Sequence, residues 1–160
     1  MVIVCDTREH DGKNDHILEY YNSKGIPWVK KKIDFCDYTF YIPKNESLGI
    51  QRDLWFDREI AVERKANLDE FANNCVKDRD RIKKEFAQAP HNKLLLIENA
   101  TYSDMVNGNY RSQYSAQSYL GTIMSFWHEY NLPVMFMPDV SQSGKFIYAY
   151  FYYYLRGIIK

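Results

Sequence analysis

The chain has 160 residues, which is long enough for one domain with a buried core and too short for two ordinary domains. Hydrophobic residues make up 46% of it and aromatic residues 16%, and 21 basic residues balance 21 acidic ones. A formal net charge of zero excludes a global electrostatic attraction to nucleic acid, so any affinity for DNA has to come from local patches.

Membrane spans, signal peptides and disulfides are not predicted. No apolar run approaches the roughly 20 residues that a membrane helix needs, and no signal-peptide pattern opens the chain. The three cysteines lack CxxC or Cys/His spacing, which argues against a disulfide framework and a zinc site. We therefore expect a soluble, intracellular protein without a membrane partner, in the cytoplasm, or in a host cell's cytoplasm if the source is viral.

The first part of the chain is expected to form a strand, a helix and two further strands. An apolar strand over 2–5 ends at Asp6, and the carboxyl ends of strands are where open α/β sheets place their chemistry. A helix is expected over 15–24, because apolar and aromatic residues at 17, 18, 20 and 21 suggest it and a glycine at 25 ends it. Alternation of apolar residues predicts strands over 28–33 and 38–42.

A basic run and an irregular segment follow these elements. The lysines at 30–32 are typical of a solvated strand edge, and a phosphate-facing patch is the alternative. Residues 44–53 show no sustained period, so they are expected to form a loop or a hairpin extension. Residues 54–57 are expected to pair with, or lead into, a central strand over 60–64.

The stretch 60–69 is the one around which the chain is organised. An apolar run leads into Glu63, and the pleat of a strand puts Glu63 and Lys65 on one face while Arg64 points away. Asn67 has the pattern of a helix N-cap, which a glutamate three residues later completes as a variant capping box.

The helix after this cap is expected to continue to about Gln88, with an apolar stripe at helical spacing on its inner face. Its outer face mixes basic and acidic residues, as solvated and salt-bridged helices do. Residues 93–97 are a continuous apolar run, which is typical of a buried parallel strand. Glu98 follows this run, where it can either serve a site or lie in solvent.

The last part of the chain is expected to hold a mobile loop over 100–114, a helix over 115–130, a strand over 134–137 and a helix over 143–159. The final helix is apolar nearly all round, which favours a homodimer through the C-terminal helices, with burial in one core as the alternative. Together the elements predict an α/β fold, a mixed central sheet flanked by helices.

Two acidic residues and one lysine suggest a metal site. A lone Glu-x-Lys is usually a solvated pair of little consequence. Here Asp37 lies upstream on another strand, and Asp37, Glu63 and Lys65 together suit a divalent cation and an attacking water. Carboxylate oxygens are the hard ligands that Mg²⁺ and Mn²⁺ require.

This arrangement resembles the core of PD-(D/E)xK nucleases. The segments Asp37-Tyr38, Glu63-Arg64-Lys65 and Asp69 are similar to the GDxnERKxxxD signature of XPF-type structure-specific endonucleases, with Cys36 where the family usually has glycine. Residues 6–9, Asp-Thr-Arg-Glu, resemble the first motif of that family, and the likeness continues through 94–99 to the C-terminus. The resemblance implies a restriction-endonuclease-like fold in a single XPF-type nuclease domain over residues 1–160, without a helix-hairpin-helix module.

The resemblance also implies an activity and roles for individual residues. The expected activity is hydrolysis of DNA phosphodiester bonds at branched, flap or junction structures, with Mg²⁺ or Mn²⁺, in DNA repair or recombination. Asp37 and Glu63 are expected to bind the metal with Asp6 as a third carboxylate, and Lys65 to orient the attacking water or neutralise developing charge. The supporting residues are Arg8, Glu9, Arg64 and Asp69, with Asp69 expected to position Arg64, Lys65 or the helix start, and the candidate DNA-binding residues are Arg79, Arg81 and Lys83.

Two alternatives share the fold. One is a catalytically silent nuclease-fold protein that binds DNA or serves as a scaffold, and the other is a resolvase of four-way junctions. All the acidic motif positions and Lys65 occur together, which favours an active enzyme over a silent relative.

Overall fold

The computed structural model describes residues 1–9 and 12–159. Seven strands form one mixed sheet in the order β2-β1-β3-β5-β6-β7, and β4 pairs with the outer part of β3. Strand β3 is antiparallel to β1, β4 and β5. The pairs β1–β2, β5–β6 and β6–β7 are parallel. The strands are β1 (Val2–Cys5), β2 (Trp28–Lys30), β3 (Tyr38–Ile42), β4 (Leu54–Trp55), β5 (Ile60–Lys65), β6 (Asn92–Glu98) and β7 (Val134–Met137).

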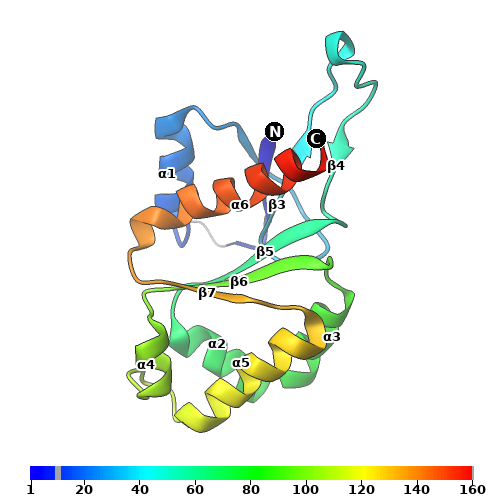
Figure 1. The fold of residues 1–160 in the computed structure, drawn as a ribbon. Coiled ribbons are helices and arrows are strands. Elements are labelled where there is room, and N and C mark those ends of the chain that lie inside the picture. Colours follow the sequence, from blue (N-terminus) through cyan, green and yellow to red (C-terminus); the bar gives the residue numbers. More distant parts are fainter. Residues whose placement is uncertain (10–11, 160) are drawn as a thin grey trace.

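The helices lie on two sides of this sheet, as the α/β prediction requires. Helices α1 and α6 lie on one side, and α2, α3, α4 and α5 lie below β5, β6 and β7 in Figure 1. Within the described ranges, no helix is both long and apolar enough to cross a membrane. The helices are α1 (Asp15–Lys24), α2 (Leu68–Lys77), α3 (Arg79–Gln88), α4 (Tyr102–Val106), α5 (Ala116–Tyr130) and α6 (Ser143–Ile158), with 3₁₀ turns at Glu46–Leu48 and Val140–Gln142.

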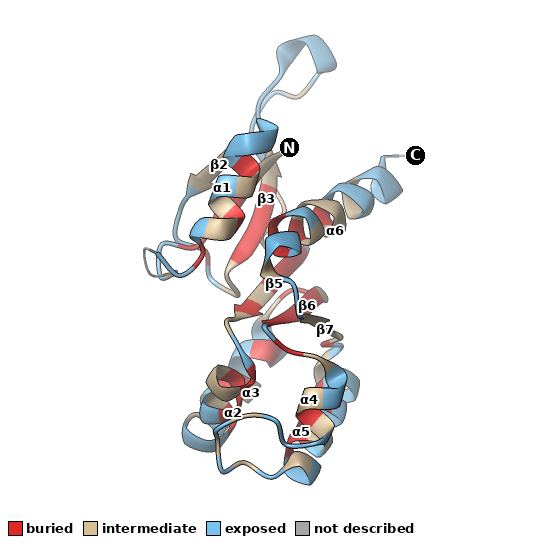
Figure 2. Cartoon of the chain, turned by 90° about the vertical axis from the view of Figure 1, so that its left-hand side faces the viewer, coloured by how far each residue is buried: buried red, intermediate tan, exposed pale blue. Residues whose placement is uncertain are grey.

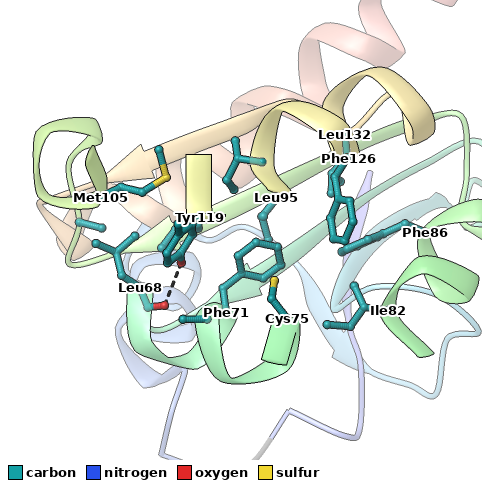
Figure 3. Packing of buried hydrophobic residues seen from close by; sticks show 14 residues of the cluster. Leu68, Phe71, Cys75, Ile82, Phe86, Leu95, Met105, Tyr119, Phe126 and Leu132 are labelled. Atoms are coloured by element: carbon teal, nitrogen blue, oxygen red, sulfur yellow. Dashed lines mark hydrogen bonds between the residues drawn. The ribbon is translucent and has the colours of Figure 1, made fainter. Parts of the chain in front are cut away.

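Two hydrophobic clusters fill the space between the sheet and these helices, and burial follows the strands and the inward helix faces (Figure 2). One of them, here named the α5 cluster, includes Phe71, Tyr119 and Phe126. In this cluster the Tyr119 hydroxyl donates to the Leu68 carbonyl at 2.8 Å (Figure 3). The other, named the α6 cluster, includes Phe40, and its other buried residues lie on β1, β3, β5, β6, α1 and α6. Because side chains alternate along a strand, consecutive residues of β6 serve opposite clusters: Leu95 and Ile97 belong to the α5 cluster, and Leu94 and Leu96 belong to the α6 cluster.

The expected helix from the Asn67 cap to Gln88 is two helices, so that prediction was wrong. Asn67 caps α2 by accepting the Glu70 N–H at 2.9 Å, as expected. The helix stops at Asp78, whose φ of −127° and ψ of 26° are not helical. Aspartate is a weak helix former, and the Asp78 side chain makes no capping hydrogen bond but pairs with Arg81 at 3.4 Å. Helix α3 starts one residue later and contributes Ile82 to the α5 cluster.

Two other elements differ from expectation. Residues 100–114 were expected to be a mobile loop, yet they contain α4, whose capping box joins Thr101 and Asp104 in both directions at 3.0 and 2.9 Å. The Thr-x-x-Asp pattern of that box is visible in the sequence. Residues 54–57 lead into β5, which is one of the two expected alternatives, but β4 pairs with β3 instead of β5, and the stacked rings of Tyr41 and Trp55 join β3 and β4.

Helix α6 packs closely against α1 and leaves aromatic surface outside. A Cβ atom placed on Gly144 would lie 2.9 Å from Cδ1 of Tyr20, so only glycine allows this approach. Tyr152 is 41% exposed, Tyr153 64% and Ile158 53%. Part of the apolar surface of α6 therefore lies outside the core.

Candidate active site

Asp37 lies where three strands meet, at the wall of a cavity of about 180 Å³. Its backbone N–H donates to the Val62 carbonyl at 3.0 Å, and its own carbonyl accepts the Asp6 N–H at 2.8 Å. Its carboxylate accepts the backbone N–H of Arg64 at 2.7 Å. The sheet therefore fixes both the position and the direction of this side chain. The cavity is lined by Asp6, Arg8, Asp34, Phe35, Cys36, Asp37, Glu63, Arg81, Glu85, Phe86 and Ala89.

Cys36 explains why the family signature has glycine before the aspartate. Its φ is +61°, in the left-handed region that favours glycine. The backbone needs this conformation where the chain turns into β3 and delivers Asp37 to the cavity. Cys36 is partly buried, whereas Cys5 and Cys75 are buried.

Glu63 and Lys65 share one face of β5, as the sequence predicts, and form an ion pair at 2.7 Å. Both side chains are about one sixth exposed, at 16% and 15%. Burial alone would lower the pKa of Lys65, but the charges of Glu63 and Asp37 outweigh it and raise that pKa. Lys65 is therefore a stable cation and suits the role of a hydrogen-bond donor, not that of a base.

The carboxylate of Asp37 is held in an unfavourable environment. Burial raises its pKa well above the ordinary value, and the charge of Glu63 raises it further, against the opposing effect of Lys65. Two carboxylates and one ammonium leave an excess of negative charge at the cavity wall. A divalent cation would relieve this excess, and Mg²⁺ needs only one or two carboxylates because it keeps several waters. The residues present thus fit such an ion.

Asp6 lines the same cavity, but its carboxylate has another partner. It accepts the Nε–H of Arg8 at 2.5 Å, and Arg8 also donates to the Ile33 carbonyl at 2.9 Å. Across residues 1–9 and 12–159, no group of three His, Cys, Asp or Glu side chains is arranged to hold a metal ion. Asp37, Glu63 and Asp6 nevertheless all line the cavity.

Arg64 points away from Glu63 and Lys65, as expected, and organises the opposite face of the sheet. Its guanidinium is buried and pairs with Glu98 at 2.6 Å and with Glu9 at 3.1 Å. His16 binds the other oxygen of Glu98 at 2.7 Å. Burial opposes ionisation of Glu98, but the hydrogen bonds from Arg64 and His16 prevail and lower its pKa. Burial raises the pKa of Glu9 in spite of Arg64.

Asp69, the last residue of the signature, contacts a loop that the sequence did not connect with it. Its carboxylate accepts the backbone N–H groups of Arg111 and Ser112 at 2.8 and 2.7 Å. It therefore holds the segment between α4 and α5 against the start of α2. No local pattern in the sequence indicates this contact, because the partners are backbone groups more than 40 residues away.

The structure distinguishes the arginines that the sequence left equivalent. Arg79 donates to the Thr122 hydroxyl at 3.0 Å and lies 5.8 Å from the Phe126 ring, so it joins α3 to α5. Arg81 lines the cavity, and its side chain is 56% exposed although it pairs with Glu85. Lys83, partly buried, follows on the same helix.

One wall of the cavity was not foreseen from the sequence. Phe35, from the turn before β3, and Glu85, from α3, line the cavity together with the signature residues. Glu85 belongs to a charged helix face whose composition is that of ordinary solvated helices, so no sequence signal singles it out. Phe35 is an apolar residue in a turn, which is a weak signal at best.

Known structures share the fold of this chain. XPF from Aeropyrum pernix superposes with a TM-score of 0.64 at 16% identity, covering 94% of this chain and 60% of that one. XPF from Aeropyrum pernix in complex with DNA gives 0.67 at 16% identity, covering 98% and 66%. The chain thus spans less than two thirds of the length of these proteins, and the likeness confirms the restriction-endonuclease-like fold.

The family follows from the sequence itself. Comparison with curated protein sequences gives no match. The ERCC4 domain, however, matches residues 5–150, a range that contains the whole signature from Asp6 to Asp69. Because this match covers most of the sequence and agrees with the expected resemblance to XPF-type nuclease domains, the chain belongs to the ERCC4 domain family.

Proposed function

We propose that this chain is a metal-dependent endonuclease that hydrolyses DNA phosphodiester bonds. The observation that carries the proposal is the joint position of Asp37 and Glu63 on one cavity wall, with the Lys65 ammonium 2.7 Å from Glu63. Membership of the ERCC4 domain family supports the same reaction class. The cation is proposed to be Mg²⁺ or Mn²⁺, because both ligands offer carboxylate oxygens.

The chain's own residues contribute binding, orientation and charge. Asp37 and Glu63 hold the cation, and a bound cation supplies an acidic water and stabilises negative charge on the phosphate. Lys65 stays protonated and donates a hydrogen bond toward the attacking water or the developing charge. The backbone N–H of Arg64 keeps the Asp37 carboxylate directed at the cavity. Asp6 is proposed to act beside these ligands, directly or through a water.

The proposed substrate is DNA with a branch, a flap or a junction. XPF from Aeropyrum pernix has been solved in complex with DNA, and DNA binding is extended from that protein to this chain as part of the proposal. Arg81 is placed to contact a strand at the cavity, because it lines the cavity and keeps an exposed guanidinium.

A homodimer is proposed through α6, with α5 beside it. The exposed Tyr152, Tyr153 and Ile158 lie near the end of α6. Exposed aromatic surface of this kind commonly marks an interface, and a two-fold axis would cover it with the same surface of a second copy. Light scattering at low micromolar concentration should give a dimer mass, which Tyr153→Glu should reduce to a monomer mass.

One assay tests the activity. Purified protein is incubated with flap, fork, four-way-junction and linear DNA in the presence of Mg²⁺, Mn²⁺ or EDTA, with Glu63→Gln as the matched inactive control. Cleavage of branched DNA that needs the metal and Glu63 is the expected result. Binding without cleavage under all conditions would contradict the proposal and favour a silent scaffold, and preference for the four-way junction would indicate a resolvase.

A further inference from the structure

A stacked aromatic pair lies on the sheet face that carries the carboxylates. Tyr41 on β3 pairs with Trp55 on β4, and their ring centroids are 4.5 Å apart with planes inclined by 17°. Because side chains alternate along a strand, Tyr41 shares its face with Asp37, whereas Phe40 points to the α6 cluster. The register between β3 and β5 places Glu63 on the face of Tyr41 as well.

The pair is accessible and is not part of the core. Tyr41 and Trp55 are both partly exposed, and neither is among the residues of the α5 and α6 clusters. Strands β3 and β4 lead from the sheet into the hairpin extension that projects at the top of Figure 1. Core packing therefore does not account for this stack.

Cations accompany the rings from the cavity to β4. The ammonium of Lys31 lies 3.8 Å from the centroid of the Trp55 ring. The guanidinium of Arg58 lies 5.5 Å from the ring of Phe35, which lines the cavity. Arg58 also pairs with Asp34, and its side chain is 65% exposed. Ring–cation pairs thus lie both at the cavity wall, at Phe35, and on β4, at Trp55.

We propose that Tyr41, Trp55 and Lys31 bind an unpaired nucleotide of the DNA strand that enters the cavity. The proposal deepens the proposed function and depends on it for the identity of the ligand. Every base offers a π face, and proteins that bind single strands combine aromatic rings with cations in this way. The base replaces Lys31 over the Trp55 ring, and the released ammonium pairs with the neighbouring phosphate.

The surface selects unpaired over paired nucleotides for a simple reason. Bases inside a duplex stack on their neighbours and present no free face to a protein ring, whereas the bases of a flap or fork arm do. The proposal gives Lys31 the phosphate-facing role, which is the less expected of the two interpretations of the lysine run at 30–32.

Tryptophan fluorescence tests the stacking directly. Replacing Trp28 and Trp127 by phenylalanine leaves Trp55 as the single tryptophan of the chain. Titration of this variant with oligothymidylate in EDTA should quench its fluorescence, because a stacked base lies against the indole. A titration without quenching, at concentrations where a labelled fork binds, would overturn the proposal.

Binding measurements give the second test. Trp55→Ala should weaken binding of a forked DNA in EDTA about tenfold, as loss of one base stack does, and should leave blunt duplex binding unchanged. Trp55→Phe should retain the affinity, and Tyr102→Ala, which removes a 50% exposed ring elsewhere, should have no effect. Unchanged fork binding by Trp55→Ala, or an equal loss for fork and duplex, would contradict the proposal. Circular dichroism confirms that each variant is folded.

Different experimental results would contradict the nuclease proposal and the nucleotide-site proposal. Binding and quenching in EDTA require no cleavage, so a protein that quenches but never cuts would refute the nuclease proposal and keep the nucleotide site. A protein that cuts branched DNA without any quenching would refute only the nucleotide site.

Discussion

The Asp37 carboxylate accepts the backbone N–H of Arg64 at 2.7 Å, and this hydrogen bond connects the two faces of the sheet. Arg64 holds Asp37 through its main chain on the cavity side and Glu98 through its guanidinium on the other side. These two contacts give a structural reason for an arginine between Glu63 and Lys65 in the signature. Its burial makes the ion pair with Glu98 important for stability as well.

Glu98→Gln should destabilise the protein by about 3 kcal/mol at neutral pH, because the buried Arg64 guanidinium loses its closer carboxylate partner and retains Glu9 at 3.1 Å. The folded protein lowers the pKa of Glu98, so its contribution is full above the ordinary carboxyl pKa of about 4.3 and is lost as the pH falls through the lower folded value. Urea unfolding at pH 7 and at pH 3 to 4 checks this, since the difference from wild type should shrink at low pH. A constant difference would contradict the assignment.

Asp37→Asn should abolish cleavage and yet raise the melting temperature in EDTA at pH 7. Burial and the charge of Glu63 disfavour the Asp37 carboxylate in the folded state, and an amide oxygen can still accept the Arg64 N–H. Addition of Mn²⁺ should stabilise the wild type and not the variant, because only a carboxylate pair holds the ion. Thermal unfolding with and without metal measures both effects, and a variant that melts below the wild type in EDTA would show that the carboxylate is not strained.

Lys65→Ala should lower the cleavage rate at least about 100-fold while Mn²⁺ still binds, because the ammonium is proposed to act at the water and not at the metal. Lys65→Arg is the matched control for charge, since it keeps a cation but changes the donor geometry. Calorimetry measures metal binding and single-turnover cleavage measures the rate. Loss of metal binding with the rate retained would reverse the assigned roles.

Local sequence patterns predicted most elements of this fold but only part of the site. Apolar periodicity and a terminal glycine were sufficient for α1, and a continuous apolar run for β6, because both signals lie within the element. The pairing of Glu63 with Lys65 followed from strand alternation alone. By contrast, Asp37 and Arg64 are 27 residues apart and Arg64 and Glu98 are 34 apart, so their contacts depend on the sheet order. Asp69 contacts two backbone N–H groups, and no pattern of residue types in the sequence indicates that contact.

Cys36→Gly should leave activity intact and change stability by less than about 1 kcal/mol. Glycine removes the strain of a left-handed residue but loses more backbone entropy on folding, and the two effects are of similar size. Cys36→Val should be clearly less stable, because a β-branched residue at φ of +61° is a severe outlier. Denaturant unfolding of the two variants compares them, and equal stability of the valine variant and the wild type would show that the turn can relax.

Two glycines of α6 provide a test of the packing between α6 and α1. Gly144→Ala places a Cβ 2.9 Å from Cδ1 of Tyr20, so the helices have to separate or Tyr20 has to leave its position. We expect a loss of about 1–3 kcal/mol, the usual cost of overpacking. Gly157→Ala is the matched control in the same helix, because nothing lies within 4 Å of its added Cβ. It should stabilise the protein by up to about 1 kcal/mol through helix propensity. Urea unfolding measures both changes, and a Gly144→Ala variant as stable as Gly157→Ala would contradict the close approach of α1 and α6.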